Sequence, residues 1–156
     1  MKQLVNIISV AFIIAILFPG CDNVTTSFGL TIGSTSFNRL NENGEFELVQ
    51  NGKFDNGEVV YLMMFDVSGF EKGPDGKHQV EMDMEITDME GNVILETREL
   101  LGENGHVELD NGIAANPNAS FSPGLNTPDG DYKFYAKIYD KVGGGSASVT
   151  KKFTLR

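Results

Sequence analysis

Three stretches of this chain alternate between apolar and polar residues, one of them strictly, and that alternation is its strongest constraint on folding. In "QVEMDMEIT", residues 79–87, every second side chain is apolar and most of the others are acidic. Residues 131–140, "DYKFYAKIYD", and 147–155, "ASVTKKFTL", alternate in the same way. A period of two places alternate side chains on opposite faces of a strand, whereas a helix has a period of about 3.6 residues. From Phe28 onward the sequence therefore predicts strands with one buried face and shows no convincing helical period.

Further strand signals, separated by turn residues, fill the rest of the chain. Residues 58–67, "EVVYLMMFDV", are apolar nearly throughout, which suits a strand in the middle of a sheet. Residues 73–76, "GPDG", predict a turn, because Pro presets φ and Gly accepts positive φ. Shorter strand candidates lie at 28–37, 45–50, 93–100, 106–110 and 119–125. About seven to nine short strands with frequent turns predict an all-β fold, a single antiparallel β-sandwich over residues 28–156.

A tyrosine opens one of the long predicted strands, after the segment "LNTPDGDY", residues 125–132. This segment resembles the tyrosine corner of immunoglobulin-like and fibronectin type III-like domains, in which the Tyr hydroxyl bonds back to nearby backbone. The resemblance implies an immunoglobulin-like sandwich in which Tyr132 is a structural corner. The alternative is that Tyr132 is an ordinary core aromatic. With no Trp and one Cys, the chain is more similar to the cysteine-free immunoglobulin-like modules of bacterial envelope proteins than to antibody domains.

The first twenty residues have the pattern of a secretory signal peptide. Lys2 provides a positive start, a mainly apolar stretch runs from Leu4 to Phe18, and the small residue Gly20 follows. The apolar stretch is shorter than the ~20 residues that a membrane-spanning helix needs, and polar chain follows at once. We therefore expect residues 1–20 to be removed rather than retained as an anchor helix.

The only cysteine, Cys21, stands directly after this stretch. Residues 17–21, "LFPGC", resemble the lipobox of bacterial lipoproteins. In that family the cysteine thiol receives a diacylglycerol, the signal peptide is cut off just before it, and the new amino group is often acylated. The resemblance implies lipidation of Cys21, a polar tether over residues 21–27, and an address in the bacterial cell envelope, either periplasm-facing or surface-exposed. A free buried thiol is the alternative, but the polar flank "CDNVTTS" offers no core around it.

The charge balance limits the range of partners. Without residues 1–20 the chain would carry 11 basic and 22 acidic residues, a formal charge of −11. Such a charge argues against nucleic acid as a partner and against a direct electrostatic grip on anionic lipid. The acyl chains on Cys21 would then attach the protein to its membrane.

No pattern in the sequence predicts catalysis. The two histidines, His78 and His106, are far apart and are most simply interpreted as solvated polar residues. No serine lies in a G-x-S-x-G motif. Residues 143–146, "GGGS", lack the Lys and the helix of a phosphate-binding loop and predict a hairpin tip instead. Two isolated histidines and one anchored cysteine do not make a zinc site. We therefore expect neither an enzyme nor a metal or other cofactor.

Calcium remains the open alternative, because loops at one end of a sandwich can gather the six to eight oxygens that it requires. Acidic residues are frequent in the predicted turns, although turns favour them anyway. They are Asp75, Asp88, Glu90, Asp110, Asp129, Asp131 and Asp140.

A row of alternating Lys and Tyr faces outward from the predicted strand at 131–140. Its members are Lys133, Tyr135, Lys137 and Tyr139. The row is a possible binding face, since exposed Tyr is common at contacts. In an immunoglobulin-like sandwich, however, this strand lies beside the strand at 79–87, whose outward row is acidic. That row consists of Glu81, Asp83 and Glu85. Cross-strand pairs worth ~0.2–1 kcal/mol each would then explain both rows through register and solubility, which is the favoured interpretation.

Three hypotheses about function follow, in descending order. The first is a non-catalytic, lipid-anchored envelope protein whose β-sandwich binds another protein or has a structural role. The second is a surface carbohydrate-binding module, which in the absence of Trp would depend on Tyr135 and Tyr139. The third is an envelope enzyme, which would require a pocket with convergent carboxylates of raised pKa.

Overall fold

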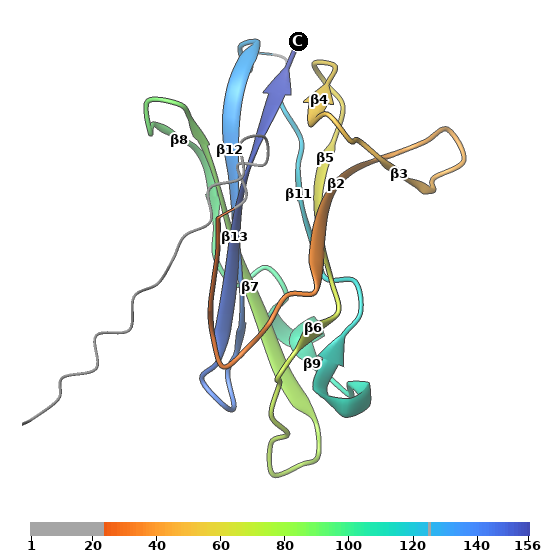
Figure 1. Cartoon of the computed structure of the whole chain (residues 1–156), viewed down its shortest axis with the longest axis vertical. Helices are drawn as coiled ribbons and strands as arrows, with labels where there is room; N and C mark the ends of the chain where they lie inside the picture. The colour runs from red at the N-terminus through yellow and green to blue at the C-terminus, as the bar shows by residue number, and fades with distance from the viewer. Residues whose placement is uncertain (1–23, 125) are drawn as a thin grey trace, which may run out of the picture.

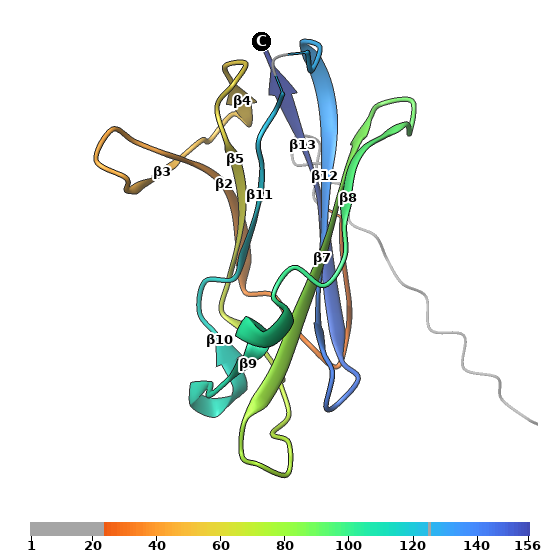
Figure 2. The ribbon, with the colours of Figure 1, turned by 180° about the vertical axis from the view of Figure 1, so that it is seen from behind.

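The computed structural model describes residues 24–124 and 126–156, which form two β-sheets packed face to face (Figures 1 and 2). This confirms the prediction of an all-β, antiparallel sandwich. The expected signal peptide and Cys21 lie outside the described residues, so cleavage and lipidation stay predictions. In the part of the chain that is described, helix is limited to two 3-10 turns, Gly102–Gly105 (η1) and Asp110–Gly112 (η2). No helix there is long and apolar enough to cross a membrane.

The larger sheet has seven strands, five of which lie in the order β1-β13-β12-β7-β8. Their bounds are Val24–Phe28 (β1), Ser146–Leu155 (β13), Gly130–Asp140 (β12), His78–Asp88 (β7) and Val93–Thr97 (β8). Lys53–Phe54 (β4) pairs parallel to β13, and His106–Val107 (β9) pairs antiparallel to β7. The three alternating stretches of the sequence thus form the neighbouring strands β7, β12 and β13, because each buries one face.

The smaller sheet has four strands in the order β11-β5-β2-β3. Their bounds are Asn118–Phe121 (β11), Val60–Phe65 (β5), Ser34–Leu40 (β2) and Phe46–Leu48 (β3). Val67–Ser68 (β6) and Ile113–Ala114 (β10) form a separate two-stranded ribbon. The nearly continuous apolar stretch becomes β5, which has strands on both sides as expected. The described strands outnumber the predicted seven to nine because β4, β6, β9 and β10 are only two residues long.

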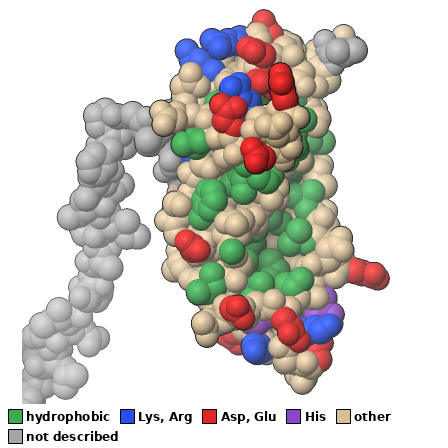
Figure 3. Space-filling view, turned by 90° about the vertical axis from the view of Figure 1, so that its right-hand side faces the viewer, with side chains coloured by type: hydrophobic (Ala, Val, Ile, Leu, Met, Phe, Trp, Pro, Cys, Tyr) green, Lys and Arg blue, Asp and Glu red, His purple; other side chains and the backbone are tan. Residues whose placement is uncertain are grey.

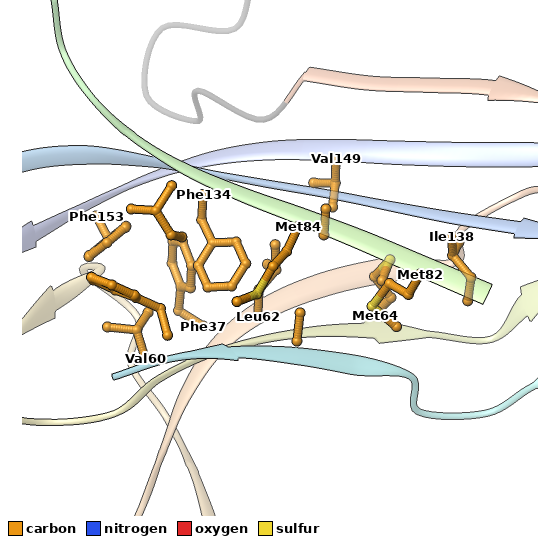
Figure 4. Packing of buried hydrophobic residues seen from close by; sticks show 14 of the residues in the cluster. Phe37, Val60, Leu62, Met64, Met82, Met84, Phe134, Ile138, Val149 and Phe153 are labelled. Carbon is orange, nitrogen blue, oxygen red and sulfur yellow. The ribbon is translucent and has the colours of Figure 1, made fainter. Parts of the chain in front are cut away.

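The core lies between the two sheets and is rich in aromatic rings. Figure 4 shows Phe134 and Met84 of the larger sheet beside Phe37 and Leu62 of the smaller one. Phe153 on β13 is the centre of the ring contacts, and its partners are Phe37, Phe54, Phe121, Tyr132 and Phe134, with centroids 5.6–6.3 Å away. Such pairs add ~0.5–1.5 kcal/mol each beyond their burial. Because Cys21 is the only cysteine, the domain depends on this packing and not on a disulfide.

Residues 24–27, which the sequence analysis placed in a polar tether over residues 21–27, lie in a strand of the domain. Val24–Phe28 forms β1, which pairs antiparallel to β13 with Val24 opposite Thr150 and Phe28 opposite Ser146. The segment showed no hydrophobic period, but Val and Thr favour extended backbone and the edge of β13 offers hydrogen-bond partners. Only Asp22 and Asn23 therefore separate Cys21 from the folded domain.

Candidate functional site

Tyr132 is both a core aromatic and a corner. Its side chain is buried, its ring stacks on Phe153, and its hydroxyl donates a hydrogen bond to the Pro128 carbonyl oxygen at 2.6 Å. This is the back-bond that defines a tyrosine corner. Burial raises the pKa of Tyr132, and the nearby carboxylates of Asp88 and Asp129 raise it further. Tyr132 therefore combines the two roles that the sequence analysis gave as alternatives, a structural corner and a core aromatic.

The Lys–Tyr row of β12 lies beside the acidic row of β7 in the larger sheet. Tyr135 is opposite Glu85, Lys137 opposite Asp83 and Tyr139 opposite Glu81. All four residues of the Lys–Tyr row are half-buried. The ammonium of Lys137 lies 5.4 Å from the centre of the Tyr139 ring, whose hydroxyl donates to Asp83 Oδ1 at 3.4 Å. Burial, followed by the charge of Asp83, raises the pKa of Tyr139.

The acidic row is less solvated than its sequence pattern suggests. Glu81 is 1% exposed and Asp83 9% exposed. Glu81 accepts backbone N–H bonds from Leu101 at 2.7 Å and Gly102 at 3.1 Å, and Lys141 Nζ lies 3.7 Å from it. Asp83 accepts a hydrogen bond from the backbone N–H of Glu99 at 3.0 Å and another from the Arg98 guanidinium at 3.2 Å. These two carboxylates thus hold the segment after β8 rather than serving mainly as partners of the β12 lysines.

We call Glu81, Asp83 and the segment after β8 that they hold the clamp. An open pocket of about 640 Å³ lies beside it. Its lining residues are Gln79, Glu81, Glu99, Gly102, Glu103, His106 and Lys141. Lys141 pairs with Glu99 at 2.8 Å, and that hydrogen bond is the first cause of the raised pKa of Lys141. Because Glu81 accepts several backbone hydrogen bonds, its carboxylate serves as a structural acceptor here.

The two histidines have different environments, and one of them corrects the sequence interpretation. His78 is only 1% exposed, and its Nδ1 accepts the Leu109 N–H at 3.1 Å. His106 is exposed, and its Nε2 lies 2.7 Å from Asp75 Oδ2. His78 was expected to be solvated because it follows a turn, but strand β9 pairs with the start of β7 and buries it.

Three of the acidic turn residues, Asp75, Asp88 and Asp140, accept backbone N–H groups of their own turns. Asp140 is buried and accepts the N–H groups of Glu71, Val142 and Gly143, each at 2.9 Å. The Asp88 carboxylate accepts hydrogen bonds from the backbone N–H and the side-chain amide of Asn92. The bond from the Asn92 side chain is the main cause of the lowered pKa of Asp88. In residues 24–124 and 126–156, no three His, Cys, Asp or Glu side chains are placed to hold a metal ion.

The outer face of the smaller sheet carries no charge, and sequence reasoning missed it. Because Phe37 and Leu62 point into the core, their neighbours along β2 and β5 point outward. The apolar side chains of this face are Leu40, Phe46, Leu48, Tyr61, Met63 and Phe65. The polar ones are Ser34, Ser36, Asn38, Asn118 and Ser120. We call these eleven residues the neutral face.

Figure 3 shows this side of the molecule, with hydrophobic side chains along its middle and charged side chains toward its two ends. Leu40, Phe46 and Leu48 are each about half exposed, at 45%, 47% and 53%. The Phe46 ring meets the Tyr61 ring edge-on with centroids 5.1 Å apart. A face without a single charge stands out in a chain of which 22% of residues are charged. The only sequence signal was that "STSFNRL" lacks acidic residues, which is too weak to act on.

Comparison with known proteins supports the fold and goes no further. No protein family and no curated protein matches the chain. Among solved structures, the C-terminal domain of Wzt superposes with a TM-score of 0.59 at 13% identity, covering 89% of this chain and 82% of that one. A Niemann-Pick type C2 protein from Japanese carpenter ant superposes with a TM-score of 0.54 at 9% identity, covering 84% and 96%. At such low identity these similarities show a shared β-sandwich fold alone.

Proposed function

We propose that the chain is a non-catalytic, lipid-anchored binding module of the bacterial cell envelope, and that its neutral face binds another envelope protein. The observation that carries the proposal is the absence of charge from a broad, partly apolar face on a strongly acidic domain. The core of a protein interface is depleted in Lys, Glu and Asp and enriched in aromatic residues and Met. Charged groups are costly to desolvate, so a surface selected for contact excludes them.

The neutral face suits a partner better than the Lys–Tyr row of β12. Tyr139 in that row already contacts Lys137 and Asp83, so a partner would have to replace existing contacts. By contrast, Leu48 and Phe46 present apolar area that nothing in the described chain covers fully. Burial of such area is worth ~25 cal/mol per Å².

The anchor is supported by the sequence pattern around Cys21. A single acyl chain binds a membrane only marginally, and two or three chains make attachment stable. Mass spectrometry of the mature N-terminus tests this part of the proposal. A diacylglyceryl cysteine at position 21 is expected, and an intact N-terminus with an unmodified thiol would contradict the anchor.

Site-specific photo-cross-linking in cells tests the binding face. Leu48 and Val93 are a matched pair, because both are apolar strand residues, 53% and 55% exposed, on different sheets. A photoreactive residue at position 48 is expected to give a discrete adduct with another envelope protein, and the same residue at 93 is not. Equal adducts from both positions, or none from position 48, would sink the proposal.

A glycan is the second candidate, and one observation favours it. Tyr61 lies between Asn38 and Ser120 on neighbouring strands, and Ser120 is the exposed uncharged hydrogen-bonding group beside the ring, since Asn38 is buried. Sugars offer hydroxyl groups and apolar C–H faces that such a surface can meet. A glycan array with residues 24–156 separates the candidates. Sugar binding that is lost in Tyr61→Ala and kept in Tyr135→Ala would favour a glycan on the neutral face.

A further inference from the structure

Strand β3 is one edge of the smaller sheet, and in the described chain it pairs with β2 alone. Its hydrogen bonds show which backbone groups are used. The Asn41 N–H donates to the Glu45 carbonyl oxygen at 2.9 Å, and the Val49 N–H donates to the Phe37 carbonyl oxygen at 2.8 Å. In an antiparallel ladder, pairs that exchange hydrogen bonds alternate with pairs that do not. These two bonded pairs therefore fix the role of every residue between them.

The alternation leaves Phe46 and Leu48 with open backbone groups. Glu47, opposite Arg39, is the bonded residue of β3, whereas Phe46 and Leu48 stand at pairs that exchange no hydrogen bonds with β2. Their N–H and C=O groups therefore point away from β2, along the free edge of the sheet. Unpaired groups of this kind are a template on which another chain can add a strand.

The side chains at this edge suit a contact as well as the backbone does. Phe46 and Leu48 belong to the neutral face and are about half exposed. Glu47, the one charged residue of β3, faces the other side, where its carboxylate lies 3.3 Å from the Arg39 side chain. The hairpin formed by β2 and β3 projects from the sandwich (Figures 1 and 2). Open hydrogen-bonding groups and exposed apolar area therefore coincide at β3.

The opposite edge of the same sheet, β11, offers only the hydrogen-bonding groups. The Met64 N–H donates to the Pro117 carbonyl oxygen at 2.9 Å, and the same alternation turns the backbone groups of Asn118 and Ser120 outward. The side chains of Asn118 and Ser120 are exposed but short and polar. A strand added at β11 would therefore bury little apolar area.

We propose that the partner of the neutral face binds as an extended segment that pairs with β3 and lengthens the smaller sheet by one strand. The proposal rests on the proposed function and specifies how the partner is held. In strand addition, main-chain hydrogen bonds provide affinity and alternate side chains provide specificity. The residues opposite Phe46 and Leu48 would place their side chains beside the neutral face. We therefore expect these residues of the partner to be uncharged and mainly apolar.

A second copy of this chain fits the edge less well than a different protein. Two copies that pair through Phe46 and Leu48 would place their two Glu47 residues directly opposite each other. Like charges in that position are destabilising. An uncharged strand from another protein meets no such repulsion, so the proposal commits to a different protein.

Hydrogen exchange in the free protein tests the open edge. Residues 21–156 retain every buried apolar residue that the structure describes, the first of which is Leu30. In this form, the amides of Phe46 and Leu48 are expected to exchange at least about tenfold faster than the amide of Glu47, which is bonded to β2. Equal protection of all three amides would show that the edge is already covered, and would contradict the proposal.

Proline substitutions test the pairing in cells, with a photoreactive residue at position 48 as the reporter. Phe46→Pro removes an outward N–H and spares the bonds between β2 and β3, because edge strands tolerate Pro at such positions. It is expected to reduce the adduct with the partner at least about tenfold. Phe46→Ala loses the ring but keeps the N–H, and should reduce the adduct only about threefold. Ser120→Pro, the matched change at the β11 edge, should leave it unchanged.

Equal losses in Phe46→Pro and Phe46→Ala would show that only the side chain matters, and would overturn the proposal. So would an equal loss in Ser120→Pro, or an adduct of twice the mass of the chain, which would identify a second copy. If urea denaturation shows Phe46→Pro to be less stable than Phe46→Ala, Leu48→Pro with the photoreactive residue at position 46 replaces it. Absence of any adduct from position 48 without these substitutions contradicts the proposed function itself, so the two failures are distinguishable.

Discussion

The two outer faces of the sandwich use polar groups in opposite ways. On the larger sheet, polar and charged side chains are buried or half-buried and bonded to the domain itself, as Glu81, Asp83 and Tyr139 show. On the smaller sheet, the neutral face has only Ser and Asn among its apolar residues. Charge on the larger sheet is therefore tied to internal bonding, whereas the uncharged neutral face is the surface that we propose to meet a partner.

The charged rows are conspicuous in the sequence, but the interaction energies of their side chains do not indicate a binding site. An exposed ion pair contributes only ~0.2–1 kcal/mol. A buried carboxylate that accepts backbone N–H groups matters more, because its removal leaves those donors unsatisfied. The clamp at Glu81 is of the second kind, and it stabilises the segment that follows β8.

The largest expected effect comes from breaking this clamp. Glu81→Ala removes the acceptor of the Leu101 and Gly102 N–H groups and the partner of Lys141. We expect a loss of about 3 kcal/mol in the free energy of unfolding. Urea denaturation measures it, and hydrogen exchange at Leu101 should rise first. A loss below about 0.5 kcal/mol would mean that the charged face is not an internally bonded unit.

The next effect concerns Tyr139 and appears at alkaline pH. Its pKa is raised in the folded protein, chiefly by burial and then by Asp83. The folded state therefore holds this proton more tightly than the unfolded chain does. That contribution is full below about pH 10 and is lost as pH rises through the folded value.

Tyr139→Phe removes the contribution, so the stability difference between wild type and variant should shrink as pH rises above about 10. Chemical denaturation at a series of pH values gives the difference. Tyr132→Phe is a useful second variant, since burial raises the pKa of Tyr132 in the same direction. If the stability difference between wild type and Tyr139→Phe stays constant across the pH series, Tyr139 is not part of the hydrogen-bonded network of the larger sheet.

A smaller effect is expected from the exposed ion pair at the rim of the charged face. The Arg98 side chain is 56% exposed and that of its partner Glu96 44% exposed. Glu96→Gln should cost no more than about 0.5 kcal/mol at low salt and nothing measurable at high salt. Denaturation with and without added salt checks this. If the loss in the free energy of unfolding persists in high salt, the Arg98–Glu96 pair belongs to the same bonded network as Glu81.

The sequence predicts the larger sheet better than the smaller one, for a physical reason. Alternation in 79–87 and 131–140 reports one buried face, so β7 and β12 were predictable together with their pairing. Burial of Glu81 depends on Leu101 and Gly102, twenty residues further along, which no local period encodes. β1 was missed because its pairing depends on the edge of β13 and not on its own apolar content.

The neutral face was missed for a related reason. Its strands read as weak, since Ser34, Ser36 and Asn38 alternate with few apolar partners, and β5 is apolar on both faces. A continuous apolar stretch usually means burial on both sides. In this domain two outward residues of β5, Tyr61 and Phe65, are covered only in part by their neighbours, although Met63 between them is buried.

The smallest expected effect on stability is the one that decides between the two faces. Leu40 is 45% exposed on the neutral face, and Val93 is 55% exposed on the larger sheet. Leu40→Lys and Val93→Lys should each change the free energy of unfolding by no more than about 0.5 kcal/mol. Yet Leu40→Lys should abolish the adduct formed by a photoreactive residue at position 48, because it places an unpaired charge inside the contact. Val93→Lys should leave that adduct intact. If both variants reduce it equally, the neutral face is no more a binding surface than the charged one.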